Sequence, residues 1–274
     1  MNRACLVLGC ALAFAGCALA QDKDANLTNS LVSVRLSAKA EQVGVLTMVK
    51  GDAPSALVLL FPGDPGVMRP EVADGRITQN RLRGNPLARA RHLLVKPGLA
   101  TVLVDCPTNQ GDSCRENYVL SKDRFEDVGK LLARVRQDLP SVKNVWVVGH
   151  SFGSHSSASV ARYGEGVIDG AIHTAAVLYA QGDYRLLAAY DFSVARVPQL
   201  FIHHRNDPCP STPYYRAEQV ANRYKIPLVT ITQASGMKGD RCQAFTEHGF
   251  MGAERELMQT ISKAVEGGVD QFKR

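Results

Sequence analysis

Hydrophobic and polar residues alternate in two stretches near the start of the chain, at residues 31–38 and 43–50, around a short turn at Glu41 and Gln42. Successive side chains of a β-strand point to opposite faces of a sheet, so a period of two indicates strands with one face buried. The two stretches therefore predict an antiparallel hairpin. We expect this hairpin to open the folded part of the chain at a sheet edge.

From residue 56 onward the alternation gives way to short, uninterrupted apolar runs, which are typical of strands buried on both faces. These runs occupy residues 56–61, 100–105, 144–149, 170–178, 198–203 and 227–232. Helical stretches at 86–95, 125–139, 152–163, 184–194, 214–224 and 253–265 separate nearly all of them. The order predicts an α/β fold, with a mainly parallel, twisted sheet of about eight strands and helices on both faces. Functional loops then belong at the carboxyl ends of the strands.

Length and composition favour one folded domain. The chain has 274 residues, of which 45% are hydrophobic and 21% charged, enough to bury a substantial core. No linker composition, low-complexity run or repeat interrupts the body of the chain. We expect a single domain at 31–274 without a large lid domain, preceded by a flexible segment at 21–30.

The first twenty residues, MNRACLVLGCALAFAGCALA, have the form of a cleavable secretory signal, with an early arginine, an apolar run and small residues before Gln21. The sequence thus predicts an exported protein, periplasmic or secreted. Two alternatives remain open, a transmembrane anchor and a lipid on Cys17, whose preceding residues resemble a lipobox. The apolar run is short and lacks a basic flank, which favours cleavage and argues against stable membrane insertion.

Cysteine usage agrees with an oxidising compartment. Four cysteines remain after the signal, and they allow three pairings. We favour Cys106 with Cys114 and Cys209 with Cys242. A zinc site formed by Cys209, Cys242 and nearby histidines is the rival, but no metal-type spacing supports it, and we expect neither metal nor cofactor.

Charge is modestly basic, with a formal net charge of +6, and six arginines fall between Arg69 and Arg91. This cluster could attract an anionic substrate, or it could be a solvated loop and helix face. No aromatic residues are interleaved with it in the manner of nucleic-acid stacking sites, so nucleic acid is not an expected partner. The oligomeric state is left open.

The motif that carries chemistry is Gly149-His150-Ser151-Phe152-Gly153, which directly follows one apolar run and precedes a helical stretch. A serine on a tight strand-to-helix turn projects its hydroxyl from the sheet, and glycines on either side remove collisions across the turn. The amino end of the following helix offers the backbone N–H of Phe152 to a developing oxyanion. Ser151 is therefore the predicted nucleophile.

At these residues the chain resembles the α/β-hydrolase superfamily, and the resemblance covers nearly all of the mature sequence. It implies a triad in the order nucleophile, acid, histidine. Asp207, which follows the apolar run at 198–203, fits the acid, with Asp183 as a substitute and a loop-capping role as the alternative. His248 fits the base, because no other histidine follows Asp207.

The segment Glu247-His248-Gly249-Phe250 is similar to the histidine loop of dienelactone-hydrolase-like members, which use a cysteine nucleophile where this chain has serine. The resemblance also implies a second oxyanion donor in the loop after Phe61. There we predict the backbone N–H of Asp64, with its carboxylate turned away or paired with an arginine such as Arg69.

Together these residues predict a serine hydrolase of carboxylic esters. A peptidase or amidase with the same triad is the first alternative, and a noncatalytic binding protein on a hydrolase scaffold is the second. Because Cys209 and Cys242 flank the acid and the base, a bond between them would tether the two loops and preorganise the triad. Within the arginine-rich segment 64–85 we expect any recognition of a substrate carboxylate.

Overall fold

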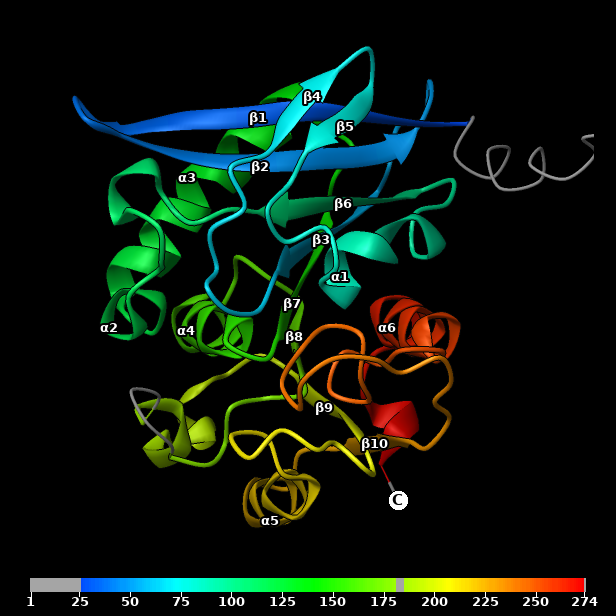
Figure 1. The fold of residues 1–274 in the computed structure, drawn as a ribbon. Coiled ribbons are helices and arrows are strands. Elements are labelled where there is room, and N and C mark those ends of the chain that lie inside the picture. Colours follow the sequence, from blue (N-terminus) through cyan, green and yellow to red (C-terminus); the bar gives the residue numbers. More distant parts are fainter. Residues whose placement is uncertain (1–25, 181–184, 274) are drawn as a thin grey trace, which may run out of the picture.

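A single eight-stranded sheet runs through the computed structural model, which describes residues 26–180 and 185–273 (Figure 1). Only its first two pairings, β1 with β2 and β2 with β6, are antiparallel, and the other five are parallel. In spatial order the strands are β1 (Leu27–Ser37), β2 (Ala40–Val49), β6 (Leu99–Val104), β3 (Ala56–Phe61), β7 (Asn144–His150), β8 (Gly170–Thr174), β9 (Gln199–His204) and β10 (Leu228–Ile231). The predicted fold class is confirmed.

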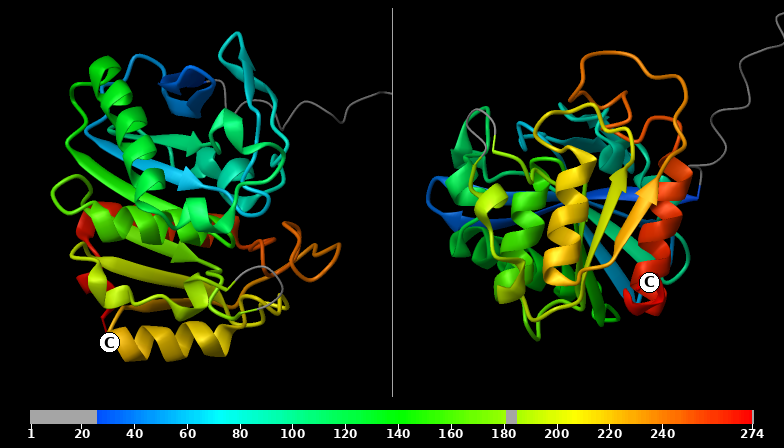
Figure 2. Two further views of the ribbon diagram at one scale, coloured as in Figure 1. Left: turned by 90° about the vertical axis from the view of Figure 1, so that its left-hand side faces the viewer. Right: turned by 90° about the horizontal axis from the view of Figure 1, so that it is seen from below.

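Helices cover both faces of this sheet, and the views in Figures 1 and 2 agree on their placement. On one face lie α1 (Pro86–Arg89) and α6 (Glu254–Gly267). On the other lie α3 (Lys122–Asp138), α4 (Gly153–Tyr163) and α5 (Tyr214–Tyr224), with the short α2 (Glu116–Val119) beside α4. This is the two-sided layering that the alternation of strands and helices predicts.

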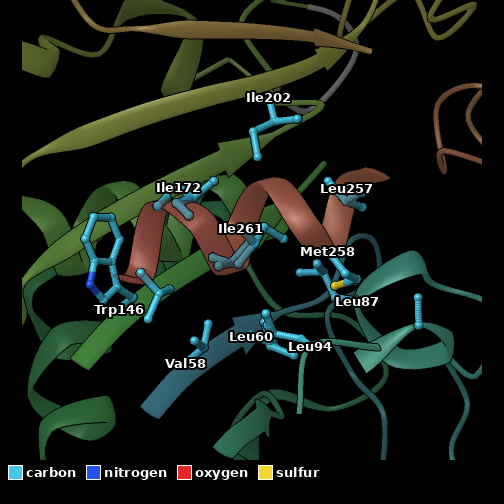
Figure 3. Packing of buried hydrophobic residues seen from close by; sticks show 14 of the residues in the cluster. Val58, Leu60, Leu87, Leu94, Trp146, Ile172, Ile202, Leu257, Met258 and Ile261 are labelled. Atoms are coloured by element: carbon cyan, nitrogen blue, oxygen red, sulfur yellow. The ribbon is translucent and has the colours of Figure 1, made fainter. Parts of the chain in front are cut away.

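The α6 face shows why the apolar runs fold into strands. Leu257 and Ile261 of α6 are fully buried and pack over Val58, Leu60 and Ile202 of the sheet (Figure 3). The alternate residues of β3, Leu57 and Leu59, belong to the cluster under α3 and α4 on the opposite face. Each such side chain contributes about 1.5–3 kcal/mol when removed from water, so both faces stabilise the central strands.

The edge hairpin is longer than predicted and its turn lies elsewhere. β1 begins at Leu27, inside the segment expected to be flexible, and the turn falls between Ser37 and Ala40, so the predicted turn at Glu41 and Gln42 is wrong. Gln42 is instead a buried strand residue whose side-chain amide donates to the carbonyl of Asp105 at 2.7 Å. That hydrogen bond explains why Gln42, a polar residue expected in a turn, lies within a strand.

Two predicted helices are shorter than expected. The stretch at 86–95 forms α1 only as far as Arg89, then a 3₁₀ turn at Arg91–Leu93. The stretch at 184–194 forms two 3₁₀ turns, Leu187–Ala189 and Phe192–Val194, and residue 184 lies outside the described part. Between these turns the Asp191 carboxylate accepts the Ser193 N–H at 3.0 Å, a local cap that competes with a continuous helix.

The segment 64–85, expected as one long loop, contains a small hairpin of β4 (Glu71–Ala73) and β5 (Arg76–Gln79). Its tip reaches β1, where the Asn29 N–H donates to the Gly75 carbonyl at 3.0 Å. The final part of the segment returns toward the carboxyl ends of the strands and begins α1.

Both disulfides have the pairing predicted above. Cys106 pairs with Cys114, with 6.0 Å between their Cα atoms, and Cys209 pairs with Cys242 at 4.6 Å. No helix in the described ranges is long and apolar enough to cross a membrane. The predicted signal, its three cysteines and the substitute acid Asp183 all lie outside these ranges.

Candidate active site

Ser151 lies on the sharp turn between β7 and α4, with a φ of 53° that residues other than glycine rarely adopt. The glycines on either side are required by close backbone contacts. A Cβ atom on Gly149 would collide with the Gly153 carbonyl, and one on Gly153 would collide with the Phe61 carbonyl of β3. The motif thus folds into the strained strand-to-helix turn that its sequence predicts, and this turn projects Ser151 at the carboxyl edge of the sheet.

Two hydrogen bonds connect Ser151 to residues far along the chain. His248 Nε2 lies 3.0 Å from Ser151 Oγ, and His248 Nδ1 lies 3.1 Å from Asp207 Oδ2. Asp207 follows β9, and His248 lies in the long loop between β10 and α6, which lies at the strand ends (Figure 2). The side chains of Asp207 and His248 are 0% and 2% exposed, so water does not compete for the bond between them.

The carboxylate of Asp207 is held on both of its oxygens. Oδ1 accepts the backbone N–H of Cys209 at 2.9 Å, and Oδ2 accepts the hydroxyl of Thr212 at 2.8 Å. Thr212 Oγ1 also lies 3.1 Å from His248 Nδ1. Nothing in the sequence indicates Thr212, because residue spacing does not show that the loop after Asp207 turns back on itself.

His150, the residue before the serine, packs its ring against His248 with 5.1 Å between ring centroids. Burial lowers the pKa of His150 well below its ordinary value, and the positive charge of His248 when it is protonated and that of Arg89 lower it further. A neutral His150 places no positive charge beside a histidine that would become protonated during catalysis.

Arg89 of α1 fixes the loop that carries His248. Its guanidinium donates to the carbonyls of Gly84, Ala244 and Gly249, with distances from 2.6 to 3.1 Å. It also pairs with the carboxylate of Glu254 at the start of α6. One arginine of the basic cluster therefore connects α1, the histidine loop and α6, a role that the sequence did not indicate.

A cavity of about 390 Å³ opens in front of Ser151. Phe152 and Asp64, the two predicted oxyanion residues, both line it, as do Cys209 and Cys242 of the second disulfide. Its full lining is Gly63, Asp64, Arg81, Leu82, Gly84, Asn85, His150, Ser151, Phe152, Val177, Cys209, Ser211, Cys242, Gln243, Ala244 and His248. The cavity thus brings together residues from the predicted nucleophile, acid and base loops and from the arginine-rich segment.

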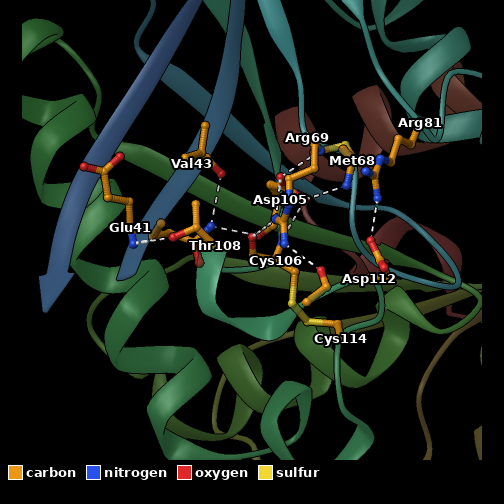
Figure 4. A network of polar contacts seen from close by, with 12 residues as sticks. Glu41, Val43, Met68, Arg69, Arg81, Asp105, Cys106, Thr108, Asp112 and Cys114 are labelled. Carbon is orange, nitrogen blue, oxygen red and sulfur yellow. Dashed lines mark hydrogen bonds and ion pairs between the residues drawn. A yellow bond between two sulfur atoms is a disulfide. The ribbon is translucent and has the colours of Figure 1, made fainter. Parts of the chain in front are cut away.

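Arg69 is not the partner of Asp64 that the sequence suggested. It pairs with the carboxylate of Asp105 at 3.3 Å, and it also donates to the carbonyls of Cys106 and Gly111 (Figure 4). Asp105 is 1% exposed, so its charge needs a nearby cation more than the exposed Asp64 does. Of the arginine cluster, Arg81 lines the cavity, and its guanidinium also pairs with the exposed carboxylate of Asp112 at 2.9 Å.

The rival metal site has no support in the part of the chain that the structure describes, where no group of three or more histidine, cysteine, aspartate or glutamate side chains could hold a metal ion. His203 and His204 are buried residues of β9. His203 Nε2 accepts the N–H of Ala176 at 2.8 Å, and His204 Nε2 lies 3.1 Å from the Gln233 carbonyl.

No family model and no curated protein matches this chain. Solved structures do match it. A dienelactone hydrolase from Anabaena variabilis is 19% identical, with a TM-score of 0.54 over 91% of this chain and 100% of its own. An esterase from Pyrococcus furiosus is 12% identical, with a TM-score of 0.58 over 92% and 96%. The Butyrivibrio proteoclasticus protein Est1E, solved with ferulic acid, is 16% identical, with a TM-score of 0.54 over 81% and 95%.

These likenesses span 95–100% of each solved chain, with TM-scores of 0.54 to 0.58. The chain therefore has the α/β-hydrolase fold, with a structural similarity to dienelactone hydrolase. At these identities the fold alone is shared, so the chemistry must be argued from the residues of the site.

Proposed function

We propose that this protein is a serine hydrolase that cleaves carboxylic esters through Ser151, His248 and Asp207. The observation that carries the proposal is the chain of two hydrogen bonds, 3.0 and 3.1 Å long, that runs from a serine on a strained turn through a buried histidine to a buried carboxylate. This arrangement lets a histidine remove the serine proton while the carboxylate stabilises the resulting imidazolium.

In the proposed reaction Ser151 Oγ attacks the ester carbonyl carbon, and its proton passes to His248 Nε2. The negative charge that develops on the carbonyl oxygen is stabilised by the backbone N–H groups of Phe152 and Asp64. His248 then gives the proton to the departing alcohol oxygen, which leaves an acyl group on Ser151. Water, deprotonated by His248, then attacks the acyl carbon; as the bond to Ser151 Oγ breaks, the proton passes from His248 to Oγ, and the carboxylic acid leaves.

Two features of the cavity bear on the substrate. A volume of about 390 Å³ suits a compact acyl group better than a long fatty chain. Arg81, at the cavity wall, is placed to meet an anionic substituent, which would compete with Asp112 for the guanidinium. A small ester, neutral or anionic, is the substrate that we propose.

We also propose that the protein is exported. The support is the signal-like sequence at 1–20 together with two disulfides in the described part of the chain. N-terminal sequencing of protein recovered from an oxidising compartment should then begin at Gln21.

A fluorophosphonate probe tests the nucleophile, because it reacts only with an activated serine. We expect one adduct, mapped by peptide mass spectrometry to Ser151, and none in the Ser151→Ala variant. An adduct at another residue, or no adduct on a folded protein, would refute the proposal. Panels of short esters, anionic esters and peptide amides then separate an esterase from a peptidase, and turnover of esters alone is expected.

A further inference from the structure

Asn85 lies in the wall of the cavity in front of Ser151 and is only 8% exposed. It precedes α1 as the N-cap residue, and its side-chain Oδ1 accepts the backbone N–H of Leu87 at 3.0 Å. The atom that accepts an N–H must be the amide oxygen, which fixes the orientation of the amide group. Nδ2, with its two hydrogens, therefore points away from the helix.

The position of Nδ2 relative to Ser151 follows from Gly63, another residue of the cavity wall. A Cβ atom placed on Gly63 would lie 3.3 Å from Asn85 Nδ2 and 3.2 Å from Ser151 Cβ. The amide nitrogen and the serine thus lie on two sides of one small space. That space stays open because residue 63 is glycine, and it adjoins Asp64, whose N–H is one of the proposed oxyanion donors.

The fold makes no use of this amide nitrogen. Within residues 26–180 and 185–273 the side chain of Asn85 has one hydrogen bond, the cap through Oδ1. Capping requires only an acceptor oxygen, which serine or aspartate supplies about equally well. Because Nδ2 has no acceptor among these residues and is not sealed from solvent, it faces the cavity, where a bound ligand can accept from its two N–H groups.

We propose that Asn85 is a catalytic residue whose Nδ2–H donates a hydrogen bond to the carbonyl oxygen of the substrate as it becomes an oxyanion. This inference rests on the proposed function. Asn85 would add a side-chain donor to the two backbone donors, held in advance by the helix cap and therefore needing no reorganisation during the reaction. The donor strengthens as charge develops on the oxygen, so it acts on kcat more than on KM.

Three variants test this role. Asn85→Asp and Asn85→Ser both keep an oxygen for the Leu87 N–H and remove the amide N–H groups. Asn80→Asp is the matched control, since Asn80 Oδ1 accepts the Leu82 N–H at 2.8 Å in the same segment but does not line the cavity. Losing one oxyanion donor lowers kcat by about 10²–10³-fold, and we expect a loss of this order in both Asn85 variants with KM little changed. Asn80→Asp should keep the wild-type kcat.

The rate of fluorophosphonate labelling gives the second readout, because the phosphonyl oxygen occupies the place of the oxyanion. We expect slower labelling of Ser151 in both Asn85 variants, with melting temperatures close to wild type. If the added charge prevents Asn85→Asp from folding, Asn85→Ser alone tests the role of the amide N–H groups. Wild-type rates of labelling and turnover in a folded Asn85→Ser protein would overturn this inference alone, whereas a wild-type protein without an adduct at Ser151 would overturn the proposed function.

Discussion

Thr212 places a hydroxyl in contact with two members of the proposed triad. Its Oγ1 lies 2.8 Å from Asp207 Oδ2 and 3.1 Å from His248 Nδ1, and the residue is fully buried. Together with the Cys209 N–H on the other oxygen, this hydroxyl fixes the plane of the carboxylate. A carboxylate held in this way presents one fixed acceptor to the imidazole throughout the reaction.

Removing that hydroxyl with Thr212→Val, which keeps the side-chain shape, should lower kcat by about 10-fold or more, since a hydrogen bond to a charged group is worth roughly 1.5–3 kcal/mol. KM should change little, because Thr212 does not line the cavity. Steady-state kinetics check both parameters. Thr212→Ser restores the hydroxyl and should recover most of the activity; equal losses in Val and Ser would show that packing, and not the hydrogen bond, is what matters.

Single residues differ in how far the sequence reveals them. Ser151 has a local signature, since the flanking glycines and the strand and helix on either side lie within a few positions of it. Asp207 and His248 follow from chain order once the strands are placed. Thr212 and Asn85 have no such signature, because their positions depend on how loops fold back across the strand ends. Only the folded structure shows that these two side chains lie at the site.

At the scale of elements, the buried strands were the most predictable parts, because continuous apolar runs have few other uses in a chain of this composition. Errors arose where a polar side chain overrides a local pattern. The hydrogen bond from the Gln42 amide to the Asp105 carbonyl stabilises Gln42 within β2, and Asp191 caps a turn inside a predicted helix. Such hydrogen bonds depend on tertiary neighbours or on short local caps, and the spacing of apolar residues predicts neither.

The loop between β10 and α6 carries His248, the proposed base, and two interactions hold this loop in place. Arg89 binds its carbonyls, and the disulfide from Cys209 to Cys242 ties it to the loop that carries Asp207. Cys209 also donates its backbone N–H to Asp207 Oδ1, so the covalent link and the acid share one short segment. This geometry supports the hypothesis that the disulfide preorganises the site.

Replacing both cysteines, Cys209→Ser with Cys242→Ser, should therefore lower stability and turnover together. The chain-entropy model assigns about 4 kcal/mol to a cross-link of this span. The comparison is Cys106→Ser with Cys114→Ser, a pair that does not line the cavity and should lose stability with a smaller fall in kcat. Urea unfolding and initial rates measure the two effects. Wild-type stability and turnover in the Cys209 and Cys242 variant would exclude the preorganising role.

For the whole molecule, the antiparallel edge of the sheet and the carboxyl ends of its parallel strands have different roles. The hairpin and the antiparallel edge complete the core, while Ser151, Asp207 and His248, the proposed triad, all follow the carboxyl ends of parallel strands. This division was predictable from strand order alone, because parallel strands place their carboxyl ends at one edge. The identity of the substrate was not predictable, since it depends on side chains that line the cavity, several of them from the segment between β3 and α1.

Buried histidines make the stability of the whole protein dependent on pH. Burial lowers the pKa of His173 and of His203 from the ordinary value of 6.5 to about 4, and lowers that of His150 well below 6.5. All three are at most 2% exposed. Between pH 6.5 and about 4 the unfolded chain binds protons at these sites and the folded protein does not, so stability falls as the pH is lowered through this window.

We expect the free energy of unfolding to fall by a few kcal/mol between pH 7 and pH 5, a range in which carboxylates of ordinary pKa titrate little. Urea unfolding at several pH values measures the slope. In His173→Gln one of the three groups is gone, and the amide can still bond to the neighbouring Ser157 hydroxyl, which lies 2.8 Å from His173 Nδ1. The variant should therefore show a shallower slope over the same range. An unfolding free energy that is constant from pH 7 to pH 5 in the wild type would contradict the burial of neutral histidines, because a proton bound only by the unfolded state must appear as lost stability.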